Sequence, residues 1–516
     1  MRMLDVMPSS GQLKSKFTLP TLTKSAGLLA LTLFAIFLGL LAAVFPVSYT
    51  IRVTIILSAA VIFLAALSIP AATPAPGRLL RGLIYALLVV WIVWPAYLTY
   101  KIGPTPGLSP TRILYWSVIL IWFFWFIASS SLRSTLWSRL KRVRPLGTIL
   151  GIYLLWMAIC AIATDHIFYS LYYAIRLMLG PVLIFLIVLS CFRGREDVER
   201  ALLYVVLAAI LSSCIGIAES VHKANFFADL LQVDPDAIAT MEWAVGDRSR
   251  DGTYRVASTF SHPLAFGEYL SMVLPLAVYQ LIYGGTALKR FLALAAFPLI
   301  AVALYTTHTR SSMVAAGVVM IFVIVFLGAR MIRQRKSFAV TILGAFMLVS
   351  IIFAALAAVS AAPELIAGRS AGEAGSTAVR LSMLERGGHL IAEEPILGYG
   401  PGLGVVTLGF LPGVSKLTLD SYFLSVVLET GVPGLLLFLG LLMIPIMKGF
   451  AFSLGKSSRE NLLAFALAAS LLAFAIVKTV LSLTNNLDSA FVLIALLAVM
   501  LVQGQGDEAG KKGSIR

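Results

Sequence analysis

Charged residues are scarce in this chain. They make up 12% of its 516 residues, whereas a soluble globular protein has about 25%, so a water-exposed surface of ordinary composition is excluded. Hydrophobic residues reach 59%, and apolar runs of about 20 residues, long enough for a helix to cross a bilayer, recur along the chain. The short alternating strands of a membrane β-barrel are lacking. The composition therefore predicts an all-α, polytopic membrane protein.

Cysteine and histidine are also rare. The three cysteines lie inside apolar runs and include no CxxC pair, so neither a disulfide framework nor a cysteine metal site is indicated. No two of the five histidines are four residues apart, the spacing of a zinc-binding helix. We therefore expect no metal and no other cofactor. The residues concerned are Cys160, Cys191, Cys214, His166, His222, His262, His308 and His389.

About fourteen apolar stretches are long enough to cross the membrane. The polar segment before Ala26 is too long for the charged region of a signal peptide, and the apolar run after it is too long for a cleaved one, so we interpret this run as the first span. The predicted spans are 26–46, 52–72, 83–100, 112–131, 146–163, 172–192, 200–219, 262–284, 291–306, 311–329, 338–359, 420–447, 462–483 and 487–503.

Lysine and arginine are distributed unequally between the two sides. With the N-terminus in the cytoplasm, most of the 40 Lys and Arg residues fall on cytoplasmic segments such as 133–144, as the positive-inside rule requires. The net charge of +16 is therefore explained by topology and implies no nucleic-acid partner. This orientation predicts cytoplasmic tails at 1–25 and 504–516, transmembrane segments at 26–220, 262–359 and 420–503, and two long extracytoplasmic loops at 221–261 and 360–419.

The longer of these two loops is where function is expected, because most other outer loops are short. It is predicted to contain a helix at 377–394, which Pro395 ends. A glycine-rich turn follows at 398–404. The apolar residues of the helix fall on one face at helical spacing, and they are Leu381, Leu384, Gly388 and Ile391.

Polar residues form four clusters at the predicted outer ends of the spans. Arginine there suits a phosphate ligand, because its planar guanidinium binds two oxygens at once and stays charged at any relevant pH. Three converging arginines would form a clamp for a diphosphate, although an arginine at a membrane boundary can also simply place its charge among the lipid headgroups. In chain order, the clusters contain Arg255 with His262, His308 with Arg310, Arg380, and Asp420.

Two further cations, Arg176 and Lys478, lie inside the predicted spans. A charge at such depth is costly and usually faces an aqueous cavity or another protein group. Each cation is therefore expected either to face an aqueous or protein cavity or to pair with a buried carboxylate. The candidate partners are Glu219, Glu268 and Glu429.

The four clusters contain motifs in a characteristic order. Along the chain they are Arg255-x4-Phe-x-x-Pro, Thr-x-x-Arg310-Ser, Arg380 followed by Pro-Ile-Leu-Gly-Tyr-Gly-Pro-Gly, and Tyr422-Phe-Leu-x4-Glu-Thr-Gly-Val-Pro-Gly. In this order and on one predicted face, the set resembles the O-antigen ligase and polysaccharide polymerase superfamily of bacterial inner membranes. The resemblance is strongest from Arg255 to Gly434.

The resemblance implies a membrane glycosyltransferase that uses neither a metal nor a nucleotide sugar. Such an enzyme takes a glycan from an undecaprenyl diphosphate carrier and passes it to a hydroxyl group. Carried over by position, Arg255, Arg310 and Arg380 would hold the diphosphate, and Arg176 and Lys478 are further candidates. A diphosphate is already a good leaving group, so catalysis mainly needs positive charge where negative charge develops.

At the start of the fourth cluster, the chain departs from the ligases of this family. They carry His-Asn there, and this chain has Asp420-Ser421, which favours the polymerase branch. Asp420 is a candidate general base for the acceptor hydroxyl and equally a candidate N-cap of the helix that follows. His262 and His308 are candidate acid–base or hydrogen-bonding groups, or caps of neighbouring helices.

We therefore predict a polymerase of lipid-linked repeat units for an exopolysaccharide, capsule or O-antigen. The expected partners are an undecaprenyl-diphosphate-linked donor and acceptor, the lipid bilayer and a chain-length regulator protein, at a bacterial inner membrane with the site facing the periplasm or exterior. Ligation of the glycan to lipid A core or to a protein is the alternative. A secondary transporter or flippase is a third hypothesis, but the polar clusters lie at the outer boundary and not at the bilayer midplane.

Overall fold

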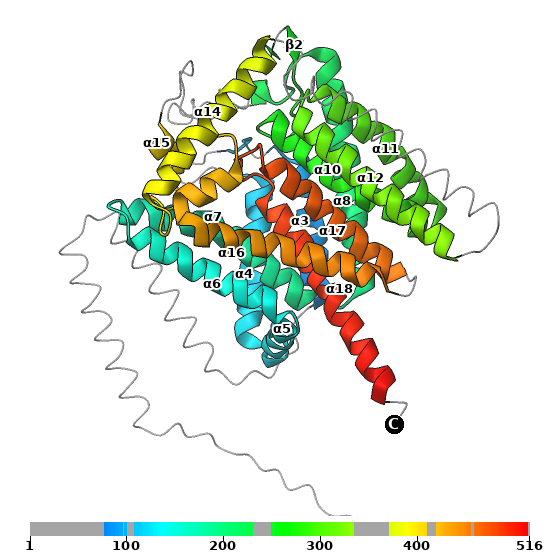
Figure 1. The fold of residues 1–516 in the computed structure, drawn as a ribbon. Helices are drawn as coiled ribbons and strands as arrows, with labels where there is room; N and C mark the ends of the chain where they lie inside the picture. Colours follow the sequence, from blue (N-terminus) through cyan, green and yellow to red (C-terminus); the bar gives the residue numbers. More distant parts are fainter. Residues whose placement is uncertain are drawn as a thin grey trace, which may run out of the picture. The chain divides into compact units, whose positions relative to one another are not determined.

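The computed structural model describes residues 77–95, 97–100, 108–230, 249–250, 252–334, 371–409, 419–455 and 459–513. All of these residues belong to one compact unit, Ala72–Arg516. They are mostly helical (Figure 1), and the only strands among them, β1 (Ser249–Arg250) and β2 (Thr253–Tyr254), form a small antiparallel pair. The predicted all-α fold class is confirmed.

The helices follow one another through mostly short connections. In chain order they are α3 (Gly77–Val93), α4 (Pro110–Ala128), α5 (Ser130–Arg142), α6 (Arg144–Ile162), α7 (Ile167–Cys191), α8 (Arg195–His222), the 3-10 turn η1 (Ala228–Leu230), α10 (Pro263–Tyr283), α11 (Ala287–Thr306), α12 (Arg310–Gln334), α14 (Ala371–Glu393), α15 (Gly404–Leu408), α16 (Tyr422–Ser453), α17 (Arg459–Lys478) and α18 (Leu487–Gly513).

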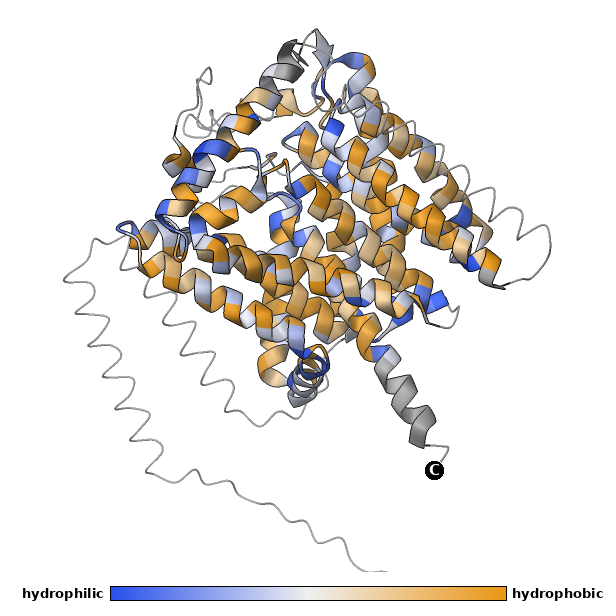
Figure 2. Ribbon diagram, viewed as in Figure 1, coloured by the Kyte–Doolittle hydropathy of each residue, from blue (hydrophilic) through white to orange (hydrophobic). Residues whose placement is uncertain are grey.

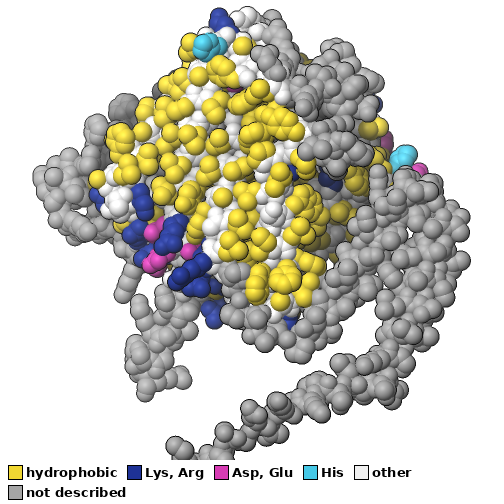
Figure 3. Space-filling model, turned by 180° about the vertical axis from the view of Figure 1, so that it is seen from behind, with side chains coloured by type: hydrophobic (Ala, Val, Ile, Leu, Met, Phe, Trp, Pro, Cys, Tyr) yellow, Lys and Arg dark blue, Asp and Glu magenta, His cyan; other side chains and the backbone are white. Residues whose placement is uncertain are grey.

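Ten of the described helices are long and apolar enough to cross a membrane: α4, α6, α7, α8, α10, α11, α12, α16, α17 and α18. Their middle portions are apolar and their polar residues gather near the ends (Figure 2). A broad expanse of hydrophobic side chains covers one face, with charged side chains gathered at its edge (Figure 3). These features identify a multi-pass membrane protein. The spans predicted at 26–46, 52–72 and 338–359 lie outside the described residues.

α3 differs from the span predicted at 83–100. It begins at Gly77 and ends at Val93. The predicted boundary is wrong because it runs through Pro95, and a proline disfavours the helical conformation of the residue before it. Beyond the helix, Tyr100 forms a β-bridge with Leu108 instead.

The basic segment at 133–144, assigned to a cytoplasmic connection, lies almost entirely within a helix, α5. The Ser129 side chain caps its start, and basic residues occupy its last turn, where they interact favourably with the helix dipole. Leu132 and Leu136, one turn apart, are both buried. Arg139 donates to the carbonyl oxygen of Leu189 at 2.6 Å and thereby attaches α5 to the end of α7.

α10 and α17 are the most deeply buried of the apolar helices, and they pack against each other. Both are apolar on all sides, as expected of a helix surrounded by other helices. Each end of α17 is attached by an ion pair: Arg459 lies 2.7 Å from Glu199 of α8, and Lys478 lies 2.9 Å from Glu268 of α10. These contacts fix the ends of the central helices against their neighbours.

α14 confirms the helix predicted at 377–394, but its packed face differs from the predicted one. Leu381 and Leu384 are 63% and 57% exposed, whereas Met383 is 2% exposed and packs with Leu424 at the start of α16. Leucine can face lipid tails at no cost in a membrane protein. Apolar spacing alone therefore does not identify which face of such a helix packs against protein.

Candidate functional site

Arg380 and Asp420 form an ion pair at the start of α16. Arg380 Nε lies 3.3 Å from Asp420 Oδ2, and about a third of each side chain is exposed. The backbone amide of Asp420 also lies 3.4 Å from the sulfur of Met383 on α14. The structure thus brings together an arginine and a carboxylate that the sequence places 40 positions apart.

Ser421 caps α16, and Asp420 does not. The Ser421 hydroxyl accepts a hydrogen bond from the amide of Leu424 at 3.3 Å. The interpretation of Asp420 as the N-cap is therefore wrong. The cap lies one residue later, which leaves the Asp420 carboxylate to pair with Arg380.

The turn between α11 and α12 forms a second group of candidates. Arg255 Nε donates to the carbonyl oxygen of Thr307 at 3.3 Å. His308 is in the left-handed conformation, with φ of 49°. Burial, and then the positive charge of Arg255, lower the pKa of His308. Arg310 follows directly and begins α12, so three of the predicted residues meet at this turn.

Glu219, in the last turn of α8, holds the segment that carries Arg255. Its buried carboxylate accepts hydrogen bonds from the amide of Ser258 at 2.6 Å and from the hydroxyl of Tyr254 at 2.9 Å. Ser258 has φ of 53°, a conformation that serine rarely adopts, and the bond to the carboxylate stabilises it. Sequence analysis considered Glu219 only as a partner for a cation in a span, and it missed this positioning role.

His262 caps α10. Its Nδ1 accepts a hydrogen bond from the amide of Leu264 at 3.1 Å. The capping interpretation of His262 is confirmed for this nitrogen. An acid–base role for His262 stays a prediction, and it would use Nε2, because Nδ1 is the acceptor in the cap.

The loop between α17 and α18 (residues 479–486) contacts the residues next to Asp420 and next to His262. The Ser482 hydroxyl donates to the carbonyl oxygen of Leu419, which lies beside the carboxylate of the first group. Asn485 Nδ2 donates to the Ser261 hydroxyl at 3.0 Å, beside the cap of α10. Sequence analysis missed this loop, although two consecutive asparagines between two apolar spans are a recognisable signal.

Lys478, at the end of α17 and next to this loop, is buried in an ion pair. Its ammonium lies 2.9 Å from Glu268, and neither side chain has any exposed area. Asn486 Nδ2 also donates to Glu268, at 2.8 Å, and Lys478 donates to the carbonyl oxygen of Leu483. Of the three glutamates considered, Glu268 is thus the partner of Lys478. The pair holds the loop in place, and no part of Lys478 is exposed to a ligand in this structure.

Arg176 lies apart from both groups. It lines a cavity of about 670 Å³ together with Arg112 of α4 and Tyr173 of α7. Thr484 and Asp488, from the α17–α18 loop and the start of α18, line the same cavity. Arg176 is therefore next to the loop that contacts the other candidates, and its predicted placement in a cavity is the one that the structure shows.

The glycine-rich turn after α14 packs into a break in α16. At Gly431 the backbone has φ of 68° and ψ of −178°, and a Cβ at this position would overlap the carbonyl oxygen of Ile396, so only glycine fits. The amide of Tyr399 donates to the carbonyl oxygen of Leu428 at 2.8 Å. The third and fourth sequence motifs therefore form one structural unit, which fixes the start of α16 against α14.

The candidate site is defined by six residues from these groups and is rich in arginine. Its arginines suit an anionic ligand with several oxygens, and its carboxylate and imidazoles are groups that can accept a proton. Among the residues that the structure describes, no group of three or more His, Cys, Asp and Glu side chains is placed to hold a metal ion. The six residues are Arg255, His262, His308, Arg310, Arg380 and Asp420.

Comparison with known proteins supports the resemblance of this region. A model of the O-antigen ligase family matches residues 270–439, from inside α10 to the second half of α16, and the match includes Arg310, Arg380 and Asp420. No curated protein matches the chain significantly. Over residues 270–439, the resemblance to the O-antigen ligase and polysaccharide polymerase superfamily is thus confirmed, and the protein is a multi-pass membrane protein similar to these ligases and polymerases.

Proposed function

We propose that this protein polymerises undecaprenyl-diphosphate-linked oligosaccharide repeat units at the outer face of a bacterial inner membrane. The observation that carries the proposal is the contact between Arg380 and Asp420 at 3.3 Å. A guanidinium that is suited to phosphate and a carboxylate that can accept a proton are thus side by side at the start of α16. Glycosyl transfer from a lipid diphosphate needs both groups, one for the leaving diphosphate and one for the attacking hydroxyl.

The proposed reaction is a single displacement at the anomeric carbon of the donor. The acceptor hydroxyl oxygen forms a bond to this carbon as the bond to the diphosphate oxygen breaks. The electron pair of the broken bond goes to the diphosphate, and the hydroxyl proton goes to the carboxylate of Asp420. The negative charge that develops on the diphosphate is stabilised by positioned arginines.

Diphosphate binding would change the ion pair. Because about a third of Arg380 is exposed, its guanidinium can exchange the Asp420 carboxylate for diphosphate oxygens with little rearrangement. The exchange releases the Asp420 carboxylate from its contact with Arg380, so that it can turn to the acceptor hydroxyl. Arg255 and Arg310, at the α11–α12 turn, are the further candidates for binding the diphosphate.

The carboxylate at position 420 favours polymerisation over ligation. Ligases of the family that this chain resembles carry histidine at this point, and the chain has aspartate. Ligation to lipid A core or to a protein would use the same donor chemistry with a different acceptor. The two functions therefore differ in the acceptor molecule: a second lipid-linked repeat unit for a polymerase, and lipid A core or a protein for a ligase.

Chain extension by the purified protein tests the proposal. The protein would be placed in lipid nanodiscs with an undecaprenyl-diphosphate-linked repeat unit as the only substrate. We expect ladders of products that differ by one repeat unit, with one undecaprenyl diphosphate released for each bond. Asp420→Asn should abolish the ladder, whereas Glu196→Gln, an exposed carboxylate at the opposite end of the helices, should retain it. No products without an added core lipid, but transfer when one is present, would identify a ligase.

A further inference from the structure

The cavity that contains Arg176 has features of a ligand site of its own. It lies between α4, α7 and the start of α18 and has a volume of about 670 Å³. This is the size of a typical small-molecule site. None of the six residues of the candidate site lines it, so its chemistry needs a separate explanation.

Two arginines, Arg112 near the start of α4 and Arg176 on α7, line this cavity. Within the described part of the chain, Arg176 forms no ion pair with a carboxylate. An arginine that lines a cavity at this depth of a membrane protein is expected to face water or a charged ligand. Two guanidinium groups on one cavity are suited to a diphosphate, for the reasons that apply to the candidate site.

Aromatic rings form another part of the wall. Trp91 and Tyr115 lie edge to face with ring centres 5.5 Å apart, and Tyr115 and Trp116 do so at 5.6 Å. Tyr173 adds a fourth ring. Broad aromatic surfaces with a few polar groups are typical of sites that hold an organic ligand in one orientation, and the apolar face of a sugar ring fits such a surface.

Asp488 supplies a buried acceptor. Its Oδ1 is buried and has no hydrogen-bond partner in the described part of the chain, a costly arrangement for a carboxylate. A carboxylate repels phosphate but accepts hydrogen bonds from hydroxyl groups. The cavity therefore combines cations for a diphosphate with a carboxylate and aromatic rings for a saccharide, which are the two polar parts of a glycolipid diphosphate.

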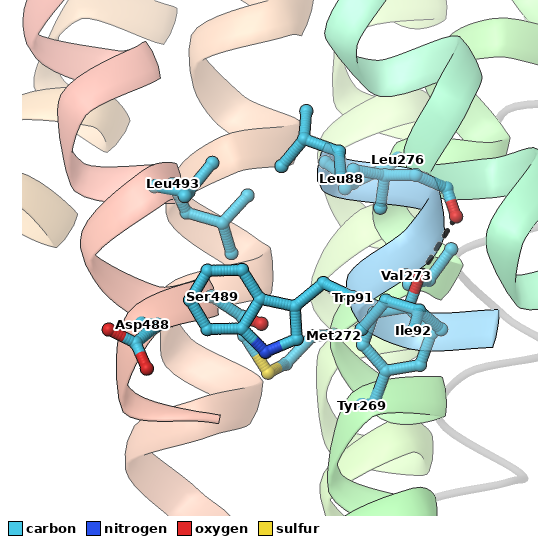
Figure 4. A pocket seen from close by; sticks show the side chains of 12 residues that line it. Leu88, Trp91, Ile92, Tyr269, Met272, Val273, Leu276, Asp488, Ser489 and Leu493 are labelled. Atoms are coloured by element: carbon cyan, nitrogen blue, oxygen red, sulfur yellow. Dashed lines mark hydrogen bonds between the residues drawn. The ribbon is translucent and has the colours of Figure 1, made fainter. Parts of the chain in front are cut away.

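The lipid chain of such a ligand would lie outside the cavity. A smaller apolar cavity adjoins the first at Trp91 and Asp488, and the Trp91 ring extends toward the start of α18 there (Figure 4). Its volume of about 40 Å³ is close to that of one water molecule, so it cannot hold a polyprenyl chain. Trp116 and Leu179 line the larger cavity and are 50% and 45% exposed, which gives it an apolar rim that can face the bilayer.

The position of the cavity connects it to the candidate site. Thr484 and Leu487 line it, and Thr484 belongs to the same α17–α18 loop in which Ser482 contacts Leu419 and Asn485 contacts Ser261. One short loop therefore lines the cavity and also contacts the residues next to Asp420 and His262. A saccharide anchored in the cavity by its diphosphate can extend past this loop toward the site.

We propose that this cavity binds the acceptor, a second lipid-diphosphate-linked saccharide, with Arg112 and Arg176 on its diphosphate and Asp488 and the aromatic rings on its first sugar. The proposal rests on the proposed function, because polymerisation uses two lipid-diphosphate-linked substrates at once. In the proposed reaction the donor separates from its diphosphate at Arg380, whereas the acceptor keeps its diphosphate. The cavity is therefore assigned to the acceptor.

Binding stoichiometry tests this assignment without catalysis. Native mass spectrometry of the full chain with undecaprenyl diphosphate should show two bound lipids for the parent and one for Arg112→Ala/Arg176→Ala. Arg290→Ala, an exposed arginine at the far end of α11, should retain two. A single lipid bound to the parent would overturn the proposal, as would phosphatidylglycerol binding in the cavity equally well. Inorganic diphosphate in place of the lipid should bind at least tenfold more weakly, because it lacks the apolar chain.

Two activity measurements separate this proposal from the function on which it rests. With a lipid-linked acceptor, Arg176→Ala should raise the acceptor KM by about tenfold or more, the effect of losing one charge-assisted contact. Arg290→Ala, the exposed control, should leave this KM unchanged. Asp488→Asn should weaken binding of the glycosylated lipid and spare bare undecaprenyl diphosphate. If Asp420→Asn abolishes extension while these cavity variants match the parent, the acceptor site is refuted and the proposed function stands.

Discussion

Two ion pairs lie near the same end of the helices, and they differ in burial. Lys478 and Glu268 are 2.9 Å apart with no exposed area on either side chain. Arg380 and Asp420 are 3.3 Å apart, and about a third of each side chain is exposed. The first pair links two central helices, α10 and α17, and the second links α14 to the start of α16.

This difference in burial fits a structural role for the first pair and the proposed catalytic role for the second. A fully buried pair cannot exchange its partner without leaving a charge unpaired in the interior, which costs several kcal/mol. An exposed pair contributes little to stability, about 0–1 kcal/mol, so its arginine can leave its carboxylate for a ligand at small cost. Removing one partner should therefore change folding in the first pair and catalysis in the second.

The largest effect is expected from the buried pair. Lys478→Met leaves Glu268 without its cation and should lower the free energy of unfolding by about 3–5 kcal/mol. The double variant Lys478→Met/Glu268→Gln removes both charges and keeps an acceptor for Asn486, so it should recover most of this loss. Unfolding in detergent, followed by intrinsic fluorescence, measures both. A double variant no more stable than Lys478→Met would contradict a role based on charge pairing.

The exposed pair should show the opposite behaviour. Asp420→Asn keeps the size of the side chain but cannot accept a proton at neutral pH, so chain extension should fall by about a hundredfold while the protein stays folded. Asp420→His restores a basic group and should recover part of the activity. Both are measured by extension of a lipid-linked repeat unit at matched protein levels. Parent activity in Asp420→Asn would leave His262 and His308 as the candidate bases.

Ser421→Ala is the matched control for Asp420→Asn. It removes the actual cap of α16, so it should cost about 1 kcal/mol of stability and leave most of the activity. The two neighbouring variants thus separate the cap from the base. Loss of activity in Ser421→Ala as large as in Asp420→Asn would show that the geometry of the helix start accounts for both effects.

The arginines should show intermediate effects. Arg255→Lys, Arg310→Lys and Arg380→Lys keep the charge but lose the planar two-point contact. A lost contact to a charged group is worth about 1.5–3 kcal/mol, which corresponds to a loss of about tenfold to a hundredfold in rate. Arg290→Lys, at the opposite end of α11, is the control. Normal product lengths and rates in all three variants would argue against a diphosphate clamp.

Much of this architecture follows from local chemistry and was predictable. The apolar runs, the helix at 377–394 and its end before Pro395 all depend on short stretches of sequence. The arginines were identified as candidate ligands of a phosphate because they lie at the ends of apolar spans, where charged residues are otherwise scarce. In the structure Arg380 pairs with Asp420, and Arg255 lies beside His308. These groupings depend on which segments meet in space, and a single sequence does not contain that information.

The parts that sequence analysis missed depend on contacts across the fold. Glu219 positions Arg255 because the end of α8 meets the segment after β2. The α17–α18 loop lies against Ser261, just before α10, because α10 and α17 pack together. The cap of α16 lies at Ser421 because the side chain one residue earlier is engaged by α14. In each case the arrangement depends on a contact between segments that are far apart in the sequence.

The smallest effect concerns His308, at the α11–α12 turn, which forms no ion pair with a carboxylate of the described residues. Burial and the charge of Arg255 lower its pKa, so the folded protein favours neutral histidine. Folding stability should then decrease as the pH falls below the unfolded pKa of about 6.5, and His308 should contribute no slope above it. His308→Asn tolerates the left-handed backbone and should flatten the decrease between about pH 6.5 and pH 5. Thermal midpoints across this range measure it, and identical slopes in parent and variant would contradict a lowered pKa of His308 in the folded protein.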